Sequence, residues 1–111
     1  MLNSGHINAY VNRLYYACFY AVSALLLTKD VSTSKHGYLR SLMHRDFVKT
    51  GLISSEMGAH FDMLFNNRQK GDYADFIVFK AEQVAPWLTP TQEFVSAVEI
   101  LISKLLEGAA Q

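Results

Sequence analysis

Helical periodicity is the feature that most constrains how this chain can fold. Between residues 7 and 25 apolar side chains recur every three or four positions, as they do on one face of an α-helix. Similar patterns predict a second helix that ends at Gly51, a third from Ser54 or Ser55 to about Gly71, and a last one over residues 91–107. The apolar positions of the first helix are Ile7, Tyr10, Val11, Leu14, Cys18, Ala21, Val22 and Leu25.

These patterns predict an all-α fold, an up-and-down bundle of four to five helices that forms one domain over residues 1–111. Residues 75–79 taken alone resemble a short strand. No partner strand is predicted elsewhere, so we interpret them as an extended connector before a helix that begins near Lys80. Proline disrupts helix interiors, and Pro86 and Pro90 therefore predict a break between Trp87 and Thr91.

Composition limits the classes of function. Half of the residues are hydrophobic, which supports a packed core and excludes disorder, and zero formal charge gives no overall basic surface for nucleic acid. A single cysteine, Cys18, excludes an internal disulfide, and its place in the apolar pattern predicts a buried, inert thiol. We find no signal peptide or membrane-spanning stretch, so a cytoplasmic protein is expected, with no membrane partner.

Two polar clusters interrupt the apolar helices. The first spans residues 12–16, around Arg13, and the second spans residues 67–73, around Arg68. Arginine within an apolar helix must reach water or a partner, because a buried unpaired charge is costly. The two helices can pack antiparallel, so we expect the clusters to share one polar groove. The alternatives are tyrosines that pack with their hydroxyls at the surface and a simple ion pair between Arg68 and Asp72.

Familiar catalytic and metal motifs are missing from the sequence. The four histidines are widely spaced and one cysteine offers no thiolate pair, so we expect no metal site and no cofactor. The sequence contains no nucleophile-elbow motif and no glycine-rich phosphate loop. Arg40 and His44 share a helix face at i, i+4 spacing, which we interpret as a solvated face.

Four ordered motifs carry a family resemblance. The run NRLYYACFYA at residues 12–21 resembles the "NRAYYAMFHA" signature of HEPN domains, and residues 35–37 resemble the family's "KTHSG" helix start. Residues 47–51 match its "FVKTG" turn, and residues 68–73 match its "RQKADY" segment. The chain is thereby identified as a member of this family of small prokaryotic helical domains, which are often encoded beside minimal nucleotidyltransferases.

The resemblance implies a helical bundle, commonly a homodimer, and a site. Catalytic family members are metal-independent ribonuclease toxins with an Arg-x4-6-His motif. Here Arg68 matches the arginine and Tyr73 stands at the histidine position. Tyrosine, with an ordinary pKa of about 10, is a poorer base, so Asp72 or His36 is the alternative for proton transfer. We therefore predict catalytic roles for Arg68, Tyr73 and Asp72, and nucleotide or RNA binding by Asn12, Arg13, Tyr16, His36 and Arg68.

Family members usually carry a further helix before the motif at residues 12–21, and this chain begins almost at that motif. We therefore expect a second chain to cover the exposed side of the first helix. The leading functional hypothesis is nucleotide or RNA binding beside a nucleotidyltransferase partner, in a toxin–antitoxin-type system. The alternatives are a non-catalytic interaction module with a buried polar network and an active metal-independent ribonuclease toxin.

Overall fold

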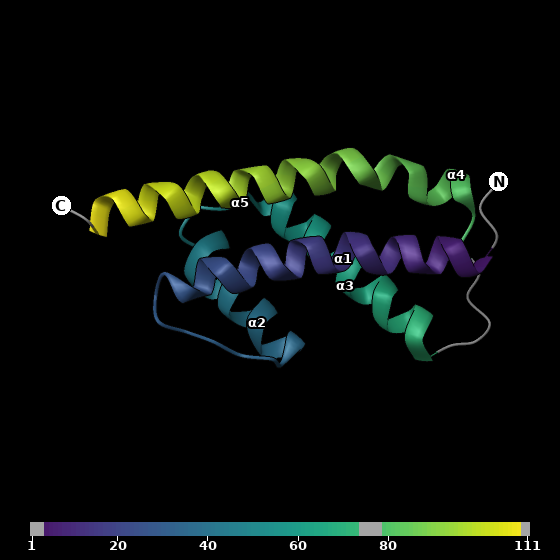
Figure 1. Ribbon diagram of the computed structural model, residues 1–111, viewed down its shortest axis with the longest axis horizontal. Helices are drawn as coiled ribbons and strands as arrows, with labels where there is room; N and C mark the ends of the chain where they lie inside the picture. Colours follow the sequence, from purple (N-terminus) through teal and green to yellow (C-terminus); the bar gives the residue numbers. More distant parts are fainter. Residues whose placement is uncertain (1–3, 74–78, 110–111) are drawn as a thin grey trace.

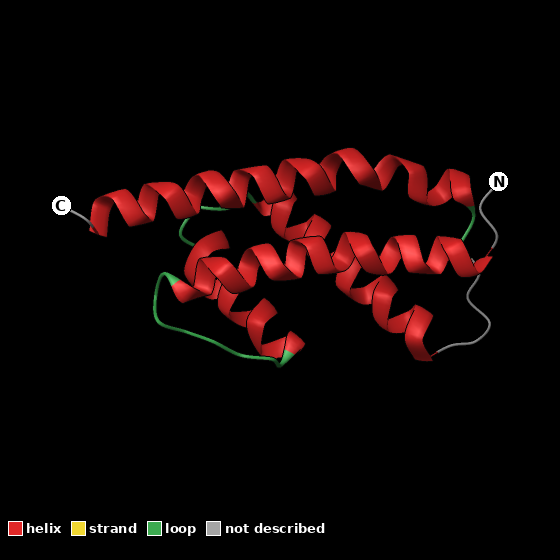
Figure 2. Cartoon of the chain, viewed as in Figure 1, coloured by secondary structure: helices red, strands yellow, loops and turns green. Residues whose placement is uncertain are grey.

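The computed structural model describes the backbone of residues 4–73 and 79–109 and the side-chain surroundings of residues 6–68 and 79–108. Every regular element in this part of the chain is helical (Figure 2), which confirms the all-α prediction. The elements are α1 (Ser4–Leu27), α2 (His36–Met43), the π-helical turn η1 (His44–Val48), α3 (Ser55–Tyr73), α4 (Ala81–Val84), the 3-10 turn η2 (Ala85–Trp87) and α5 (Leu88–Ala109).

The two long helices α1 and α5 lie side by side and run in the same direction (Figure 1). Helix α2 packs against α1 on the side away from α5. Helix α3 crosses α1 obliquely, runs broadly opposite to it and also contacts α5. The bundle is elongated, with extents of 50 × 25 × 19 Å. None of the described helices is both long enough and apolar enough to cross a membrane.

Helix α1 is the centre of the core because it contacts α2, α3, α4 and α5. Its periodic apolar residues Val11, Tyr15, Cys18, Val22 and Leu25 are at most 1% exposed. All of them except Val11 share one core cluster with buried aromatic side chains from other elements. Each buried aromatic side chain contributes roughly 1.5–3 kcal/mol of hydrophobic stabilisation. These aromatic residues are Phe47, Phe61 and Phe94.

A smaller apolar cluster closes the end of the bundle near the N-terminus. It joins Ile7 and Val11 of α1 to Phe79 and Val84, with Trp87 packed against it. This contact explains why α4 sits over the start of α1 (Figure 1). The bundle therefore buries apolar side chains over most of the length of α1.

Some of the helix boundaries agree with those predicted from the sequence. Ser54 Oγ accepts a hydrogen bond from the Met57 amide at 3.2 Å, and Gly51 has a φ of +83°, a value that favours glycine. Helix α2 begins at His36, and Lys35 at its N-cap forms no capping hydrogen bond through its side chain. Thr33 accepts a hydrogen bond from the Lys35 amide at 3.1 Å, in the loop before the helix.

The predicted helix break lies in the wrong place. Pro86 sits in the 3-10 turn η2, and α5 already begins at Leu88. Pro90 is therefore in the first turn of α5, where an amide would have no acceptor within the helix and proline is tolerated. The predicted extended connector falls largely on residues 75–78, which lie outside the described residues.

Candidate functional site: a tyrosine, histidine and arginine cluster

Arg68 of α3 lies against two neighbouring tyrosines of α1. Its Nη2 donates a hydrogen bond to the Tyr16 hydroxyl at 3.0 Å. Its guanidinium carbon is 5.5 Å from the centroid of the Tyr15 ring and 5.4 Å from that of Tyr16, within cation–π range of both. The two polar clusters of the sequence therefore meet, through residues that are 52 positions apart.

His36, the first residue of α2, completes this arrangement. A hydrogen bond of 2.7 Å joins its Nδ1 to the Tyr15 hydroxyl, and its ring stacks on Phe19 with a centroid separation of 4.3 Å. The ring also meets Tyr16 edge to face. We call Tyr15, Tyr16, His36 and Arg68 the Tyr–His–Arg cluster. Three helices contribute to it, and the loop before α2 brings His36 back to α1.

Burial and charge set the ionisation of the cluster. Burial, with the nearby positive charge of Arg68, lowers the pKa of His36 below its usual value of 6.5. Burial raises the pKa of the Tyr15 phenol well above its usual value of 10, against the smaller opposing effects of Arg68 and Arg40. Near neutral pH the cluster therefore holds a neutral imidazole and a neutral phenol beside a permanently charged guanidinium.

This combination is suited to an anionic ligand that needs proton transfer. A guanidinium presents planar donors that match phosphate oxygens, and half-buried surroundings strengthen its electrostatic effect. A histidine beside it can move a proton near neutral pH. The geometry is thus compatible with phosphate recognition and with acid–base chemistry.

A second polar group, which the sequence did not predict, joins α2 and η1 to α3. The Asp62 carboxylate accepts a hydrogen bond from His44 Nε2 at 2.9 Å and lies 3.5 Å from Arg40 Nη1. The Arg40 guanidinium also covers the Phe65 ring, 4.6 Å from its centroid. The interpretation of Arg40 and His44 as a solvated face is therefore wrong. Their spacing showed a shared face, but the partner on α3 depends on how the two helices pack.

Asn12 and Arg13 are placed differently from the cluster. Both side chains are exposed on α1. Arg13 lines a separate hollow with His6, Ala9 and Tyr10. Among the described residues, neither Asn12 nor Arg13 forms a hydrogen bond or ion pair with the cluster. Their part in ligand binding remains a prediction.

Asp72 and Tyr73 belong to the last turn of α3, but their side chains lie outside the described residues. The predicted Arg68–Asp72 pair and the predicted role of Tyr73 as a base therefore remain predictions. The structure instead brings His36, from another helix, onto the same two tyrosines as Arg68. A sequence motif with fixed spacing on one helix could not have revealed this neighbour.

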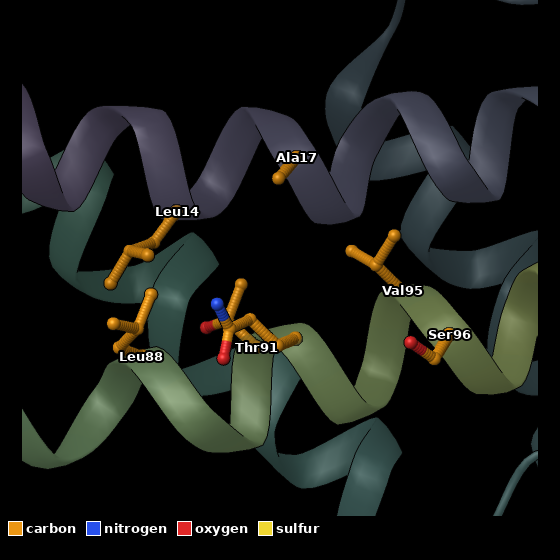
Figure 3. Close-up of a pocket in the computed structure, with 7 residues that line it drawn as sticks. Leu14, Ala17, Leu88, Thr91, Val95 and Ser96 are labelled. Atoms are coloured by element: carbon orange, nitrogen blue, oxygen red, sulfur yellow. The ribbon is translucent and has the colours of Figure 1, made fainter.

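An apolar groove between α1 and α5 has a volume of about 480 Å³ (Figure 3). None of its lining residues carries a charge, which makes it unsuitable for a phosphate. Leu14 and Ala17 of α1 face Leu88 and Val95 of α5 across it. The other lining residues are Thr91, Gln92 and Ser96.

Three further side chains with reactive groups, Cys18, His60 and Thr91, are buried or hydrogen-bonded. Cys18 is fully buried, as expected, and burial raises the pKa of its thiol to about 12. The Thr91 hydroxyl donates to the Trp87 carbonyl at 2.7 Å and so accepts the hydrogen bond from His60 Nε2 at 2.8 Å. In the part of the chain that the structure describes, no group of three or more His, Cys, Asp or Glu could hold a metal ion.

Comparison with known proteins decides the family. The HEPN domain model matches residues 1–101. The chain belongs to the HEPN domain family. A "UPF0332 protein" of Thermotoga maritima is 41% identical over 105 residues, which cover 95% of this chain and 80% of that protein. Among solved structures, none matches this HEPN chain at a significant level.

Two relatives come from Methanocaldococcus jannaschii. The protein named "Putative toxin MJ0142" is 34% identical over 110 residues, or 97% of this chain and 75% of that protein. "Putative toxin MJ0605" is 35% identical over 81 residues, or 65% of this chain and 60% of that protein. These HEPN relatives therefore bear names that point to a toxin.

Proposed function

We propose that this HEPN chain is a toxin-type protein that binds RNA or a nucleotide through a phosphate at the Tyr–His–Arg cluster. One observation carries the proposal: the Arg68 guanidinium is held on the Tyr15 and Tyr16 rings beside a neutral His36. The names of the relatives from M. jannaschii support the toxin role.

The position of Arg68 favours binding for an energetic reason. Two tyrosine rings and the Tyr16 hydroxyl already restrict its long side chain. Ordering a free arginine would oppose association, and a guanidinium that is already held loses less entropy when an anion binds. The same two tyrosines also contact His36, so they fix the position of Arg68 relative to His36.

The second candidate function is metal-independent cleavage of RNA. The observation that favours it is the position of His36, which contacts the same two tyrosines as Arg68. Burial and the Arg68 charge both lower the pKa of its imidazole. In this version Arg68 stabilises negative charge at the scissile phosphate and His36 transfers the proton. Tyr73 and Asp72 are the alternatives for that step, proposed from the family motif alone.

Partners form the remaining part of the proposal. A minimal nucleotidyltransferase is the proposed protein partner, which would make the pair a toxin–antitoxin system. A second copy of the chain is the proposed cover for the α1–α5 groove, whose lining is largely apolar. Asn12 and Arg13, exposed on α1, are proposed to contact RNA outside the cluster.

RNA binding in the presence of a chelator tests the main proposal. We expect Arg68→Ala to weaken the affinity for RNA by ten- to a hundredfold, since a charged hydrogen bond is worth roughly 1.5–3 kcal/mol. Arg45→Ala is the matched control, because Arg45 is exposed and forms an ion pair with its neighbour Asp46. A loss of folding stability in Arg68→Ala with unchanged RNA affinity would favour the interaction module instead.

Cleavage is measured separately on the same proteins. If the second candidate function holds, wild-type protein cuts RNA in chelator, and His36→Gln abolishes cleavage while it retains RNA binding. Tyr73→Phe then retains activity. Cleavage that survives in His36→Gln and disappears in Tyr73→Phe would assign the proton transfer to Tyr73.

A further inference from the structure

We propose that Tyr20 is a base-stacking residue of the RNA site, and that the ligand is single-stranded RNA. This inference rests on the proposed phosphate site at Arg68 and names the class of its substrate. Tyr20 lies on α1 one turn beyond Tyr16, and its side chain is 65% exposed, the highest value among the exposed large hydrophobic residues.

The Tyr20 ring is joined to the Tyr–His–Arg cluster through Tyr16. The two ring centroids are 5.7 Å apart and the planes are inclined by 33°. The Arg68 guanidinium carbon lies 5.4 Å from the same Tyr16 ring. A cation and an exposed aromatic ring thus lie against one shared tyrosine.

Contacts beneath Tyr20 hold its ring in place. Phe19 is buried and meets Tyr20 edge to face, with a centroid separation of 5.7 Å, while it also stacks on His36. The aromatic series Tyr20, Tyr16 and Phe19 therefore forms a supported platform, and Tyr20 is its exposed end. A ring supported in this way loses little conformational freedom when another flat group stacks on it.

A nucleotide carries a charged phosphate and a flat base on one sugar. The arginine suits the phosphate, and the exposed ring suits the face of the base. In a duplex both faces of each internal base are covered by neighbouring bases, so stacking on a protein ring requires an unpaired nucleotide. The juxtaposition of Arg68 and Tyr20 therefore selects single-stranded RNA over duplex RNA.

Binding of a short unstructured oligoadenylate, in chelator, tests this inference. We expect Tyr20→Ala to weaken binding by about tenfold, a typical loss for one base–aromatic contact, and Tyr20→Phe to bind like wild type. Tyr38→Ala is the matched control: Tyr38 is also exposed, on α2, and no ring contact joins it to the cluster among the described residues. Duplex RNA of the same length should bind more weakly than the single strand.

The outcomes separate this inference from the proposed function. Binding that falls in Arg68→Ala but not in Tyr20→Ala overturns the stacking role and leaves the phosphate site standing. No RNA binding by wild type overturns both. Size measurement on Tyr20→Ala adds a third outcome: a change in oligomeric state with unchanged RNA affinity would assign Tyr20 to an interface between copies of the chain and overturn the inference.

Discussion

At the scale of single residues, His36 combines a structural contact with a proposed chemical role. Its hydrogen bond to Tyr15 ties α2 to α1, while burial and Arg68 keep its imidazole neutral. The sequence identified His36 through the family motif, because a histidine at a helix start carries no other distinguishing pattern. Its contact with Tyr15 across 21 residues depends on the path of the loop before α2.

The lowered pKa values of His36 and His60 predict that acid destabilises the fold. Burial is the first cause for both, so the unfolded chain binds these protons more readily than the folded chain. Stability is therefore full above the unfolded pKa of about 6.5 and falls as the pH drops through and below it. Urea unfolding between neutral pH and about pH 5 measures this slope.

The double variant His36→Gln, His60→Gln isolates the histidines from carboxylates that titrate in the same range. We expect a smaller loss of stability between neutral pH and about pH 5 in the variant than in wild type. An equal loss in both proteins would show that these two imidazoles do not control the acid response.

Thr91 is the buried polar residue that joins α5 to α3. Its hydroxyl bonds both the Trp87 carbonyl and His60, and it is 3% exposed. Thr91→Val should lower the free energy of unfolding by about 1–2 kcal/mol, because the His60 donor loses its acceptor. Thr89→Val, at an exposed position of the same helix, is the control for helix propensity. If the two variants were equally stable, the Thr91 hydroxyl would not contribute to the stability of the fold.

At the scale of elements, the packing of η1 against α3 is the feature that the sequence could not predict. Periodicity gives the helix over this stretch but not the π-helical turn at His44–Val48, because no local residue pattern encodes its extra residue. The turn brings His44 to Asp62. It also brings Val48 and His44 close to Gly58, whose missing side chain makes room for them.

Gly58→Ala tests this close approach. A Cβ at this position would lie 3.1 Å from Val48 Cγ2 and 3.2 Å from His44 Cε1. Crowding costs roughly 1–3 kcal/mol, which exceeds the gain in helix propensity of about 1 kcal/mol. We therefore expect a net loss of about 1 kcal/mol in thermal or urea unfolding.

Gly37→Ala is the matched control, because a Cβ there meets nothing within 4 Å and the residue also lies in a helix. It should be neutral or stabilising by up to about 1 kcal/mol. If both alanine variants stabilised the protein to the same extent, the packing of η1 on α3 would be looser than the structure shows.

At the scale of the whole molecule, the all-α class and most helices could be predicted, since one-sided apolar periodicity fixes both. The break near the prolines could not be placed, because proline in the first turn of α5 is harmless and only the position of the helix start reveals this. The meeting of Tyr16 with Arg68 was expected from two polar clusters on helices that pack together. The pairing of Arg40 and His44 with Asp62 was not expected, because it depends on the rotation of α2 about its own axis.

The proposed association with a second copy of the chain also concerns the whole molecule. The groove between α1 and α5 and the exposed Ile100 and Leu106 of α5 leave apolar surface uncovered. We expect size measurement in solution to give a dimer. A compact monomer at all concentrations would contradict this proposal and would not bear on the proposed phosphate site.

The most direct test of the central claim is the salt dependence of RNA binding. If Arg68 neutralises a phosphate, the slope of log affinity against log salt should fall by about 0.7 in Arg68→Ala, the value for one phosphate of a single strand. Arg45→Ala, which alters an exposed local ion pair, should keep the wild-type slope. Identical slopes for wild type and Arg68→Ala would mean that Arg68 holds tyrosines in place and does not bind the phosphate of RNA.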